Sequence, residues 1–169
     1  GPSRSMTRAE AAAIFARLLA EKNGDTISTA ANTKFADIPA HAWYSGYVKY
    51  LSNNGITYGK SKTVFAPNDA ITRAEFTTMA VRFFDVYGDG DAEIMEQFSG
   101  FNDVSSGYWA AEYIKYAALH GWINGYGDGS FHADREINRA EVVTIVNRLL
   151  GREADEDYIA DNLRKLNTF

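Results

Sequence analysis

An arginine recurs three times beside what reads as the start of a helix. The stretches MTRAE, ITRAE and INRAE place Arg8, Arg73 and Arg139 at the first helical position, directly after a threonine or an asparagine. A positive charge there opposes the helix dipole, so helix formation alone does not explain the arginine. Free N–H groups and a guanidinium fork at one point would suit an anion. The alternative is an ion pair with a nearby acid such as Asp37 or Asp103.

Aromatic side chains and a glycine-rich loop supply further candidates. The loop GYGDGSF at residues 125–131 holds Tyr126 among three glycines. Tight turns explain the glycines, while an exposed tyrosine beside such a turn can stack on a sugar ring. Trp43 and Trp109 stand at two predicted helix starts. That position favours core anchors over ligand platforms, and both roles stay open.

Other chemistry is sparse in this sequence. The chain has no cysteine, which excludes disulfides, thiolate metal sites and cysteine nucleophiles. Its three histidines share no metal-ligand spacing. Residues 87–93 lack the pattern of a calcium loop, and the carboxylates sit at caps and turns rather than as a catalytic pair. We therefore predict no enzyme, no catalytic residue, no metal ligand and no cofactor.

The candidate residues belong to an internal repeat. A shift of 66 residues lays the second half of the chain on the first, and the number of identities in one register excludes chance. Each repeat contains two predicted helices joined by a glycine-rich loop, which indicates an all-α fold. The recurring pairs include Trp43 and Trp109, Tyr47 and Tyr113, Gly55 and Gly121, Phe65 and Phe131, and Arg73 and Arg139.

The two helices of a repeat differ in how they begin. The first starts near the tryptophan, shows apolar residues at helical spacing and stops at Gly55. The second starts at a capping box, in which Thr72 and Glu75 satisfy each other's backbone N–H groups. Three such helices are predicted, beginning at Thr7, Thr72 and Asn138, and we expect them to surround an approximate threefold axis.

Composition limits the class of protein. Hydrophobic residues make up 46% of the chain and aromatic residues 14%, enough to bury a core. The net charge of -5 and the pI of about 5.2 argue against nucleic acid as a partner. No apolar run approaches the roughly 18 residues that a membrane span requires.

The chain is out of phase with its own repeat. It contains three capped helices but only two tryptophan helices, so the first repeat lacks its front half. We expect one uncovered apolar face, around Ile14, Phe15 and Leu18, to be covered by residues 151–169, by another chain or by the rest of the parent protein. The predicted segments are 1–6, a cloning remnant; 7–34, the second half of repeat 1 with a linker; 35–100, repeat 2 with a linker; 101–150, repeat 3; and 151–169, a helix followed by the start of a further half-repeat.

The combined pattern resembles the S-layer homology repeat. It consists of Phe-x-Asp, a tryptophan, a helix ending at glycine, the sequence INGYGDGSF and the sequence I(T/N)RAE. Residues 101–150 match closely, residues 35–84 match at their ends, and repeat 1 is represented by residues 6–19. In repeat 2 the loop departs from the pattern, with Lys60 in the position of Tyr126 and Lys62 in that of Asp128.

The resemblance implies a function. Such repeats form a pseudo-threefold, all-helical module that anchors a secreted bacterial surface protein to the cell wall. They bind a secondary cell-wall polysaccharide in grooves between repeats, often through a pyruvylated amino sugar. The alternative is a structural or protein-interaction module in which the arginines join repeats or subunits. The candidate ligand-binding residues are Arg8, Arg73, Arg139, Tyr126, Gly127, Asp128, Gly129, Trp43 and Trp109.

Overall fold

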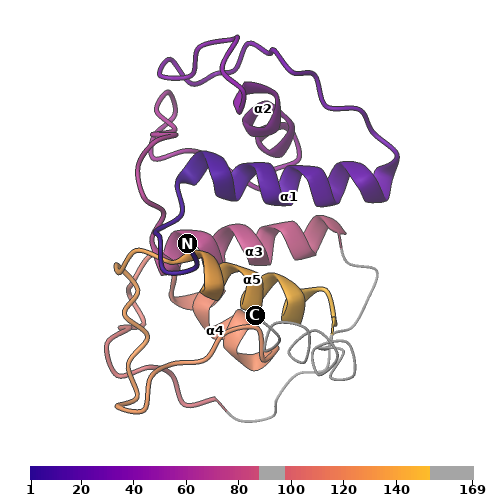
Figure 1. The fold of residues 1–169 in the computed structure, drawn as a ribbon. Helices are drawn as coiled ribbons and strands as arrows, with labels where there is room; N and C mark the ends of the chain where they lie inside the picture. The colour runs from indigo at the N-terminus through magenta and orange to yellow at the C-terminus, as the bar shows by residue number, and fades with distance from the viewer. Residues whose placement is uncertain (88–97, 153–169) are drawn as a thin grey trace, which may run out of the picture.

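The computed structural model describes residues 1–87 and 98–152, and this part of the chain is helical (Figure 1). Its only extended pairings are three isolated bridges, Ser5 with Asn138, Thr7 with Ala70, and Thr72 with Glu136. None of the helices within the described ranges is long and apolar enough to cross a membrane. The helices are α1 (Arg8–Asn23), α2 (Ser45–Asn53), α3 (Arg73–Tyr87), α4 (Ala111–Leu119) and α5 (Arg139–Leu149).

The three predicted capped helices are α1, α3 and α5, and each begins where its capping box places it. The side chains of Thr7 and Asn138 cap α1 and α5, and each helix returns the glutamate of its first turn to the cap backbone. At α3 the N–H of Glu75 donates to Thr72 Oγ1 (3.2 Å), and the N–H of Thr72 donates to Glu75 Oε2 (3.1 Å). The predicted helix starts are confirmed.

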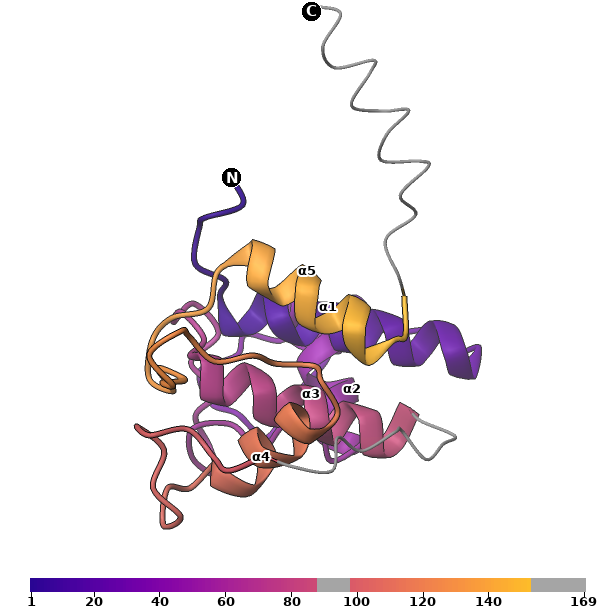
Figure 2. The same ribbon diagram turned by 90° about the horizontal axis from the view of Figure 1, so that it is seen from below.

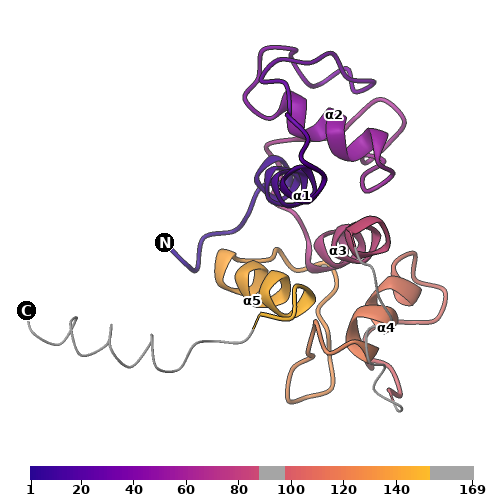
Figure 3. The ribbon, with the colours of Figure 1, turned by 90° about the vertical axis from the view of Figure 1, so that its right-hand side faces the viewer.

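A ring of backbone hydrogen bonds joins the starts of these helices. The N–H of Met6 donates to the carbonyl oxygen of Ile137 (3.0 Å), that of Ile137 to Ile71 (3.0 Å), and that of Ile71 to Met6 (2.9 Å). Each segment thus donates to one neighbour and accepts from the other. Seen end-on in Figure 3, α1, α3 and α5 form a triangle, which agrees with the predicted pseudo-threefold array.

Residues 2–6 take part in this arrangement, which differs from the expectation that residues 1–6 lie outside the fold. The carbonyl oxygens of Pro2 and Arg4 accept the N–H groups of Ala140 (3.1 Å) and Arg139 (3.2 Å). In the same way, the carbonyl oxygens of Pro67 and Asp69 accept hydrogen bonds from the first N–H groups of α1, and those of Ala133 and Arg135 accept from the first N–H groups of α3. The segment before each capped helix therefore follows one common path.

The tryptophan helices pack on the capped helices that precede them in the chain. Helix α2 lies against α1, and α4 lies against α3 (Figures 1 and 3). The predicted open face of α1 is therefore wrong: Phe15 is fully buried, and Ile14 and Leu18 pack against the core as half-buried side chains. The error came from pairing each tryptophan helix with the capped helix of its own repeat. Within residues 1–87 and 98–152, no tryptophan helix packs on α5.

The buried core side chains come from the capped helices α1, α3 and α5 and from α2 and α4, which pack on α1 and α3. Figure 2 shows these helices from a second direction. Phe15 of α1 contacts the rings of Phe76 and Phe83 of α3, with centroid distances of 5.2 Å and 4.9 Å. Tilted aromatic pairs at such distances add to the stabilisation from buried area. Part of the linker after repeat 2, residues 88–97, and nearly all of the predicted segment 151–169 lie outside the described residues.

Candidate functional site: the grooves between repeats

The first arginine is buried where α1 meets the following repeat. Only 4% of Arg8 is exposed. Its Nε donates to the carbonyl oxygen of Phe65 (2.7 Å), one terminal nitrogen lies 3.0 Å from Glu75 Oε1, and the guanidinium stands 4.9 Å from the Phe65 ring centroid. Arg8 therefore connects α1 to the loop after α2 and to the first turn of α3.

Arg73 makes the corresponding contacts one repeat later. Its Nε donates to the carbonyl oxygen of Phe131 (2.9 Å), and its terminal nitrogens donate to Glu141 Oε1 (2.8 Å) and to the carbonyl oxygen of Asn124 (3.2 Å). Burial lowers the pKa of Arg73, and electrostatic interactions with Tyr126 and Glu141 partly offset this effect. Because Arg8 and Arg73 make the same kinds of contact, the arginine occupies an equivalent buried position between successive repeats.

The acids predicted as ion-pair partners of the arginines serve another purpose. Asp37 accepts the N–H groups of Phe65 (2.9 Å) and Ala66 (2.6 Å). Asp103 accepts those of Phe131 and His132, both at 2.7 Å. Partial burial opposes ionisation of Asp103, but these N–H groups hold its pKa below the ordinary carboxyl value. Both aspartates therefore fix the loops whose carbonyl groups bind the arginines.

The actual partners are the glutamates of the capping boxes. In Glu75, Oε2 accepts the cap N–H of its own helix while Oε1 faces Arg8. Glu141 divides its two oxygens in the same way between Asn138 and Arg73. Burial raises the pKa of Glu141, but these contacts and Arg135 outweigh it and leave the pKa lowered. The recurrence of glutamate two residues after each arginine was the sequence signal for this pairing.

Arg139 departs from the pattern. It is exposed, and its guanidinium makes no contact that matches those of Arg8 and Arg73 within residues 1–87 and 98–152. Glu10, the glutamate that the threefold arrangement would offer it, pairs instead with Arg4. No described loop occupies the position that residues 55–66 hold beside α1. The structure therefore brings two of the three predicted arginines into inter-repeat contacts and leaves the third at the surface.

A cavity of about 390 Å³ opens beside Arg8. Its walls come from the start of α1, the loop after α2, residues 75–82 of α3, and Trp109, two residues before α4. Three positive side chains and one carboxylate face it together with two aromatic rings. The lining residues that carry charge or an aromatic ring are Arg8, Tyr58, Lys60, Glu75, Arg82 and Trp109.

The cations of this cavity are held in place. Arg82 donates to the hydroxyl of Tyr113 (3.1 Å) and stands 4.7 Å from the centroid of the Tyr58 ring. Lys60 pairs with Asp69 at the surface, at 3.2 Å. Glu75 balances Arg8, and Asp69, which lies outside the lining, pairs with Lys60, so the local excess of positive charge comes chiefly from Arg82. An acidic protein thus presents a locally cationic groove.

A second cavity, of about 370 Å³, occupies the equivalent place beside Arg73. The predicted Tyr126 lines it, and its ring lies 5.4 Å from the Arg73 guanidinium. Gly127, Asp128 and Gly129 do not line this cavity. Asp128 accepts the hydroxyl and N–H of Ser130 (2.6 Å and 3.0 Å), which lower its pKa and fix the turn.

The tryptophans are not core anchors. Trp43 is 56% exposed and Trp109 is 57% exposed, so the favoured expectation for both was wrong. Trp109 forms one wall of the cavity beside Arg8, whereas Trp43 lies outside it. No tryptophan stands in the corresponding position beside Arg73. Trp122 lines the cavity beside Arg73, but only 3% of this side chain is exposed, so among the described residues only the groove beside Arg8 combines the loop, the arginine and an exposed tryptophan.

Sequence reasoning missed Tyr58 and the two capping glutamates as groove residues. Tyr58 stands where Asn124 stands in the next repeat, so the repeat pattern did not mark it. Within the described ranges, no group of three or more His, Cys, Asp or Glu side chains is placed so that it could hold a metal ion. What the groove offers is charge complementarity to an anion and an aromatic surface.

Comparison with known proteins identifies the repeat. The pattern of the S-layer homology domain matches residues 34–77 and 100–143. A cellulosome-anchoring protein of Acetivibrio thermocellus is 33% identical over 153 residues, and a surface-layer 125 kDa protein of Lysinibacillus sphaericus is 32% identical over 153 residues. An amylopullulanase of Thermoanaerobacterium thermosulfurigenes is 30% identical over 154 residues.

The matches cover most of this chain but only parts of those proteins. They span 89%, 88% and 91% of the chain, and 33%, 12% and 8% of the three relatives. The first two relatives carry names of surface-layer and anchoring proteins, which agrees with the predicted location at the cell surface outside the cell. With its two matched segments and its helical repeat array, the chain belongs to the S-layer homology domain family.

Proposed function

We propose that this chain anchors a surface protein to the bacterial cell wall by binding an anionic secondary cell-wall polysaccharide. The groove beside Arg8 is the binding site, and a pyruvylated amino sugar is the preferred unit. The observation that carries this proposal is the cavity in which Arg82, Lys60 and an exposed Trp109 converge. The names of the anchoring and surface-layer relatives support the same role.

The contacts in the groove suit a compact anion on a sugar. No described residue accepts a hydrogen bond from the second terminal nitrogen of Arg8, so this nitrogen can donate to a carboxylate. Phe65 and Glu75 fix the guanidinium, which reduces the entropy lost on binding. Trp109 offers a flat apolar surface for the face of a sugar ring. The glycan would therefore bind by charge at one end and by stacking at the other.

The alternative is a structural module that assembles surface proteins. One observation favours it: Arg8 and Arg73 are buried in ion pairs between repeats, so part of their role is architectural. In that case the exposed tryptophans would contact protein rather than glycan.

Calorimetry with a pyruvylated amino-sugar fragment and with its counterpart lacking the pyruvyl group separates these functions. Trp109→Ala should weaken binding of the pyruvylated fragment about tenfold, close to the 1.4 kcal/mol that an aromatic contact can supply. Trp43→Ala is the matched control, because Trp43 is equally exposed but outside the cavity. Equal affinity for both fragments, or equal loss of affinity in both variants, would reject the proposed site.

A separate experiment tests the anchoring role itself. The wild-type chain should be retained on purified cell walls, and this retention should be lost when the polysaccharide is removed.

A further inference from the structure

The chain contains three Asn-Gly sequences, at residues 23–24, 54–55 and 124–125. Asparagine is among the thermolabile residues, and a following glycine makes it more reactive. The backbone nitrogen of the glycine attacks the side-chain carbonyl carbon of the asparagine, and no glycine side chain blocks the approach. The attack requires that neither the glycine N–H nor the asparagine amide is held by another group. Hydrogen bonding at each pair therefore decides which asparagine reacts.

The first two pairs lie at the ends of α1 and α2 and are held at both groups. The N–H of Gly55 donates to the carbonyl oxygen of Ser52 (3.3 Å). Asn54 Nδ2 donates to the carbonyl oxygen of Tyr50 (2.9 Å). In residues 23–24, the glycine N–H bonds to the last turn of α1 and the asparagine amide donates to the hydroxyl of the same Tyr50 (3.3 Å). Both pairs must open locally before they react.

The third pair is free at both groups. Asn124 is exposed and lines the cavity beside Arg73. In the described part of the chain, neither the Asn124 amide nor the Gly125 N–H makes a hydrogen bond, and only the Asn124 carbonyl oxygen is bound, by Arg73 (3.2 Å). A side-chain carbon added to Gly125 would lie 2.6 Å from the carbonyl oxygen of Ser130. The fold thus requires the glycine that makes Asn124 reactive.

We propose that Asn124 is a site of spontaneous deamidation, which converts it into aspartate and isoaspartate beside Arg73. The Gly125 nitrogen forms a bond to Asn124 Cγ, the bond from Cγ to Nδ2 breaks, and the proton of the Gly125 N–H leaves with the amide as ammonia. Water then opens the resulting cyclic imide at one of its two carbonyl carbons. Opening at the side-chain carbon gives aspartate. Opening at the main-chain carbon gives isoaspartate, whose main-chain carboxylate is then free.

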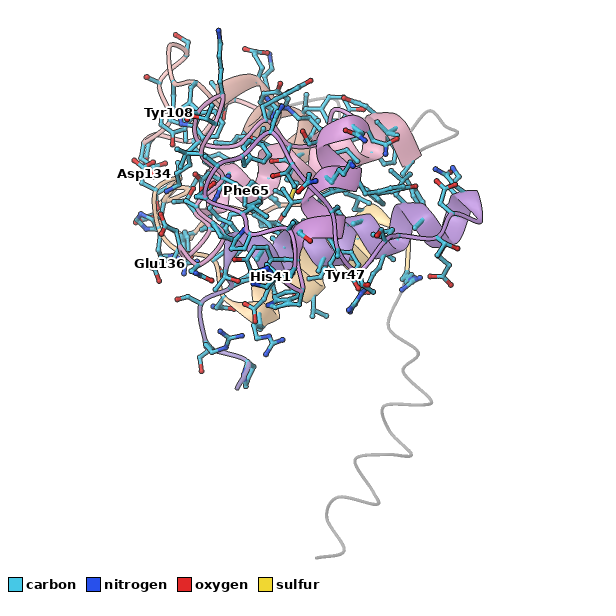
Figure 4. All side chains as sticks on the ribbon, turned by 90° about the horizontal axis from the view of Figure 1, so that it is seen from above. His41, Tyr47, Phe65, Tyr108, Asp134 and Glu136 are labelled. Atoms are coloured by element: carbon cyan, nitrogen blue, oxygen red, sulfur yellow. The ribbon has the colours of Figure 1, made fainter. Side chains whose placement is uncertain are left out.

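The isoaspartate carries its carboxylate at the atoms that already contact Arg73. The oxygen that accepts from the guanidinium at 3.2 Å belongs to the main-chain carbonyl group that becomes this carboxylate. The loop itself is fixed further along, because the Tyr108 hydroxyl donates to Asp134 Oδ1 (2.7 Å) and Asp103 accepts the N–H of Phe131 (2.7 Å). Figure 4 labels Tyr108 and Asp134. The new carboxylate therefore stays within reach of Arg73 and forms an ion pair with it.

The modification changes the charge of one cavity and spares the other. Arg73, Arg148 and Glu141 are the charged residues that line the cavity around Asn124, so one added carboxylate removes its excess of positive charge. In the cavity beside Arg8 the equivalent position is Tyr58, which has no such chemistry. The two cavities therefore diverge as the protein ages. This inference does not depend on the proposed function, whose site is the cavity beside Arg8.

Peptide mapping by mass spectrometry tests the proposal on the intact chain, incubated at mildly alkaline pH and then digested. Asn124 should deamidate at least about tenfold faster than Asn23 and Asn54, since each of those must first lose two hydrogen bonds. The same chain unfolded in urea is the matched control, and there the three asparagines should react at similar rates. Equal rates in the folded chain, or a lead of Asn124 that persists in urea, would overturn the proposal.

A second measurement follows the product. An isoaspartyl methyltransferase should label the digest of the aged chain but not the aged chain in its folded state, because Arg73 holds the carboxylate. Equal labelling of both samples would refute the ion pair, and aspartate as the sole product would refute the isoaspartate. Asn124→Gln should remove the signal, since the glutamine side chain would have to close a larger ring. A signal that survives Asn124→Gln would assign the modification to another residue.

Discussion

Replacing Arg8 by alanine should destabilise the protein, while the same change at Arg139 should not. Arg8 is 4% exposed and makes a hydrogen bond to the Phe65 carbonyl and an ion pair with Glu75. Arg139 occupies the same position of a homologous helix but is exposed. The two variants therefore differ in inter-repeat contacts while sharing the change in helix propensity and in helix-dipole interaction.

The magnitude follows from the contacts. A hydrogen bond to a charged group contributes about 1.5–3 kcal/mol. The loss of a fully buried partner can cost about 3–5 kcal/mol, but the Glu75 side chain keeps 19% of its surface exposed, so water can partly solvate it. We expect Arg8→Ala to lower the free energy of unfolding by about 3 kcal/mol, or the Tm by roughly 6–12 °C for a domain of this size. Arg139→Ala should stay within about 0.5 kcal/mol.

Urea unfolding followed by tryptophan fluorescence and by circular dichroism measures both values, and coincident curves establish that the two-state treatment applies. A double-mutant cycle with Glu75→Gln separates the ion pair from the hydrogen bond to Phe65. If Arg8→Ala costs less than about 1 kcal/mol, or if Arg139→Ala costs as much, the argument that inter-repeat contacts explain the recurring arginine is refuted.

Three further changes test the local reasoning. Thr72→Ala should lower the free energy of unfolding by about 1 kcal/mol through the lost cap, measured by urea denaturation, and Thr72→Ser should restore it. Gly59→Ala should cost roughly 1–3 kcal/mol, because φ is +81° and the added carbon would lie 2.6 Å from a carbonyl oxygen; Gly127→Ala, with nothing within 4 Å, is the thermal-melt control. In the folded protein the pKa values of Asp103 and Glu141 lie below those of ordinary carboxyl groups. The two ionised carboxylates therefore stabilise the fold fully at a pH above the ordinary pKa, and this stabilisation is lost as the pH falls through the folded-state pKa. The Tm should therefore fall as the pH is lowered below about 4. The Tm of Asp103→Asn should fall less steeply with pH than that of the wild-type chain. An identical slope in both proteins would contradict the lowered pKa of Asp103.

Local signals in the sequence were sufficient for the helices but not for their pairing. The capping boxes at Thr72 and Asn138 and the 66-residue repeat correctly predicted where the capped helices begin. The repeat did not reveal that α2 covers α1, because similarity between repeats is the same whichever neighbour a helix packs on. Nothing in the spacing within one repeat distinguishes these two arrangements.

The candidate site was predictable in its residue types and less so in its contacts. The recurrence of Arg8 and Arg73 marked them correctly as side chains with a shared role. The sequence analysis did not identify Glu75 as an ion-pair partner of Arg8, because its role in the capping box already explained the glutamate. One carboxylate can accept from both donors. The exposure of Trp109 was missed because an aromatic residue at a helix start is compatible with either a core or a surface position. These details depend on contacts between repeats, which periodicity does not encode.

The ring formed by Met6, Ile71 and Ile137 makes the junction between α1 and α5 the mechanical weak point of the described structure. The backbones of these two helices do not approach each other closely, so the backbone hydrogen bonds of residues 2–6 join the start of α1 to the start of α5. A pull on Gly1 directed away from α5 would load the bonds from Ala140 to Pro2 and from Arg139 to Arg4 one after the other, as in unzipping. The units α1–α2 and α3–α4 would then bear force only after the ring has opened. The direction of tension on the chain thus decides which bonds resist first.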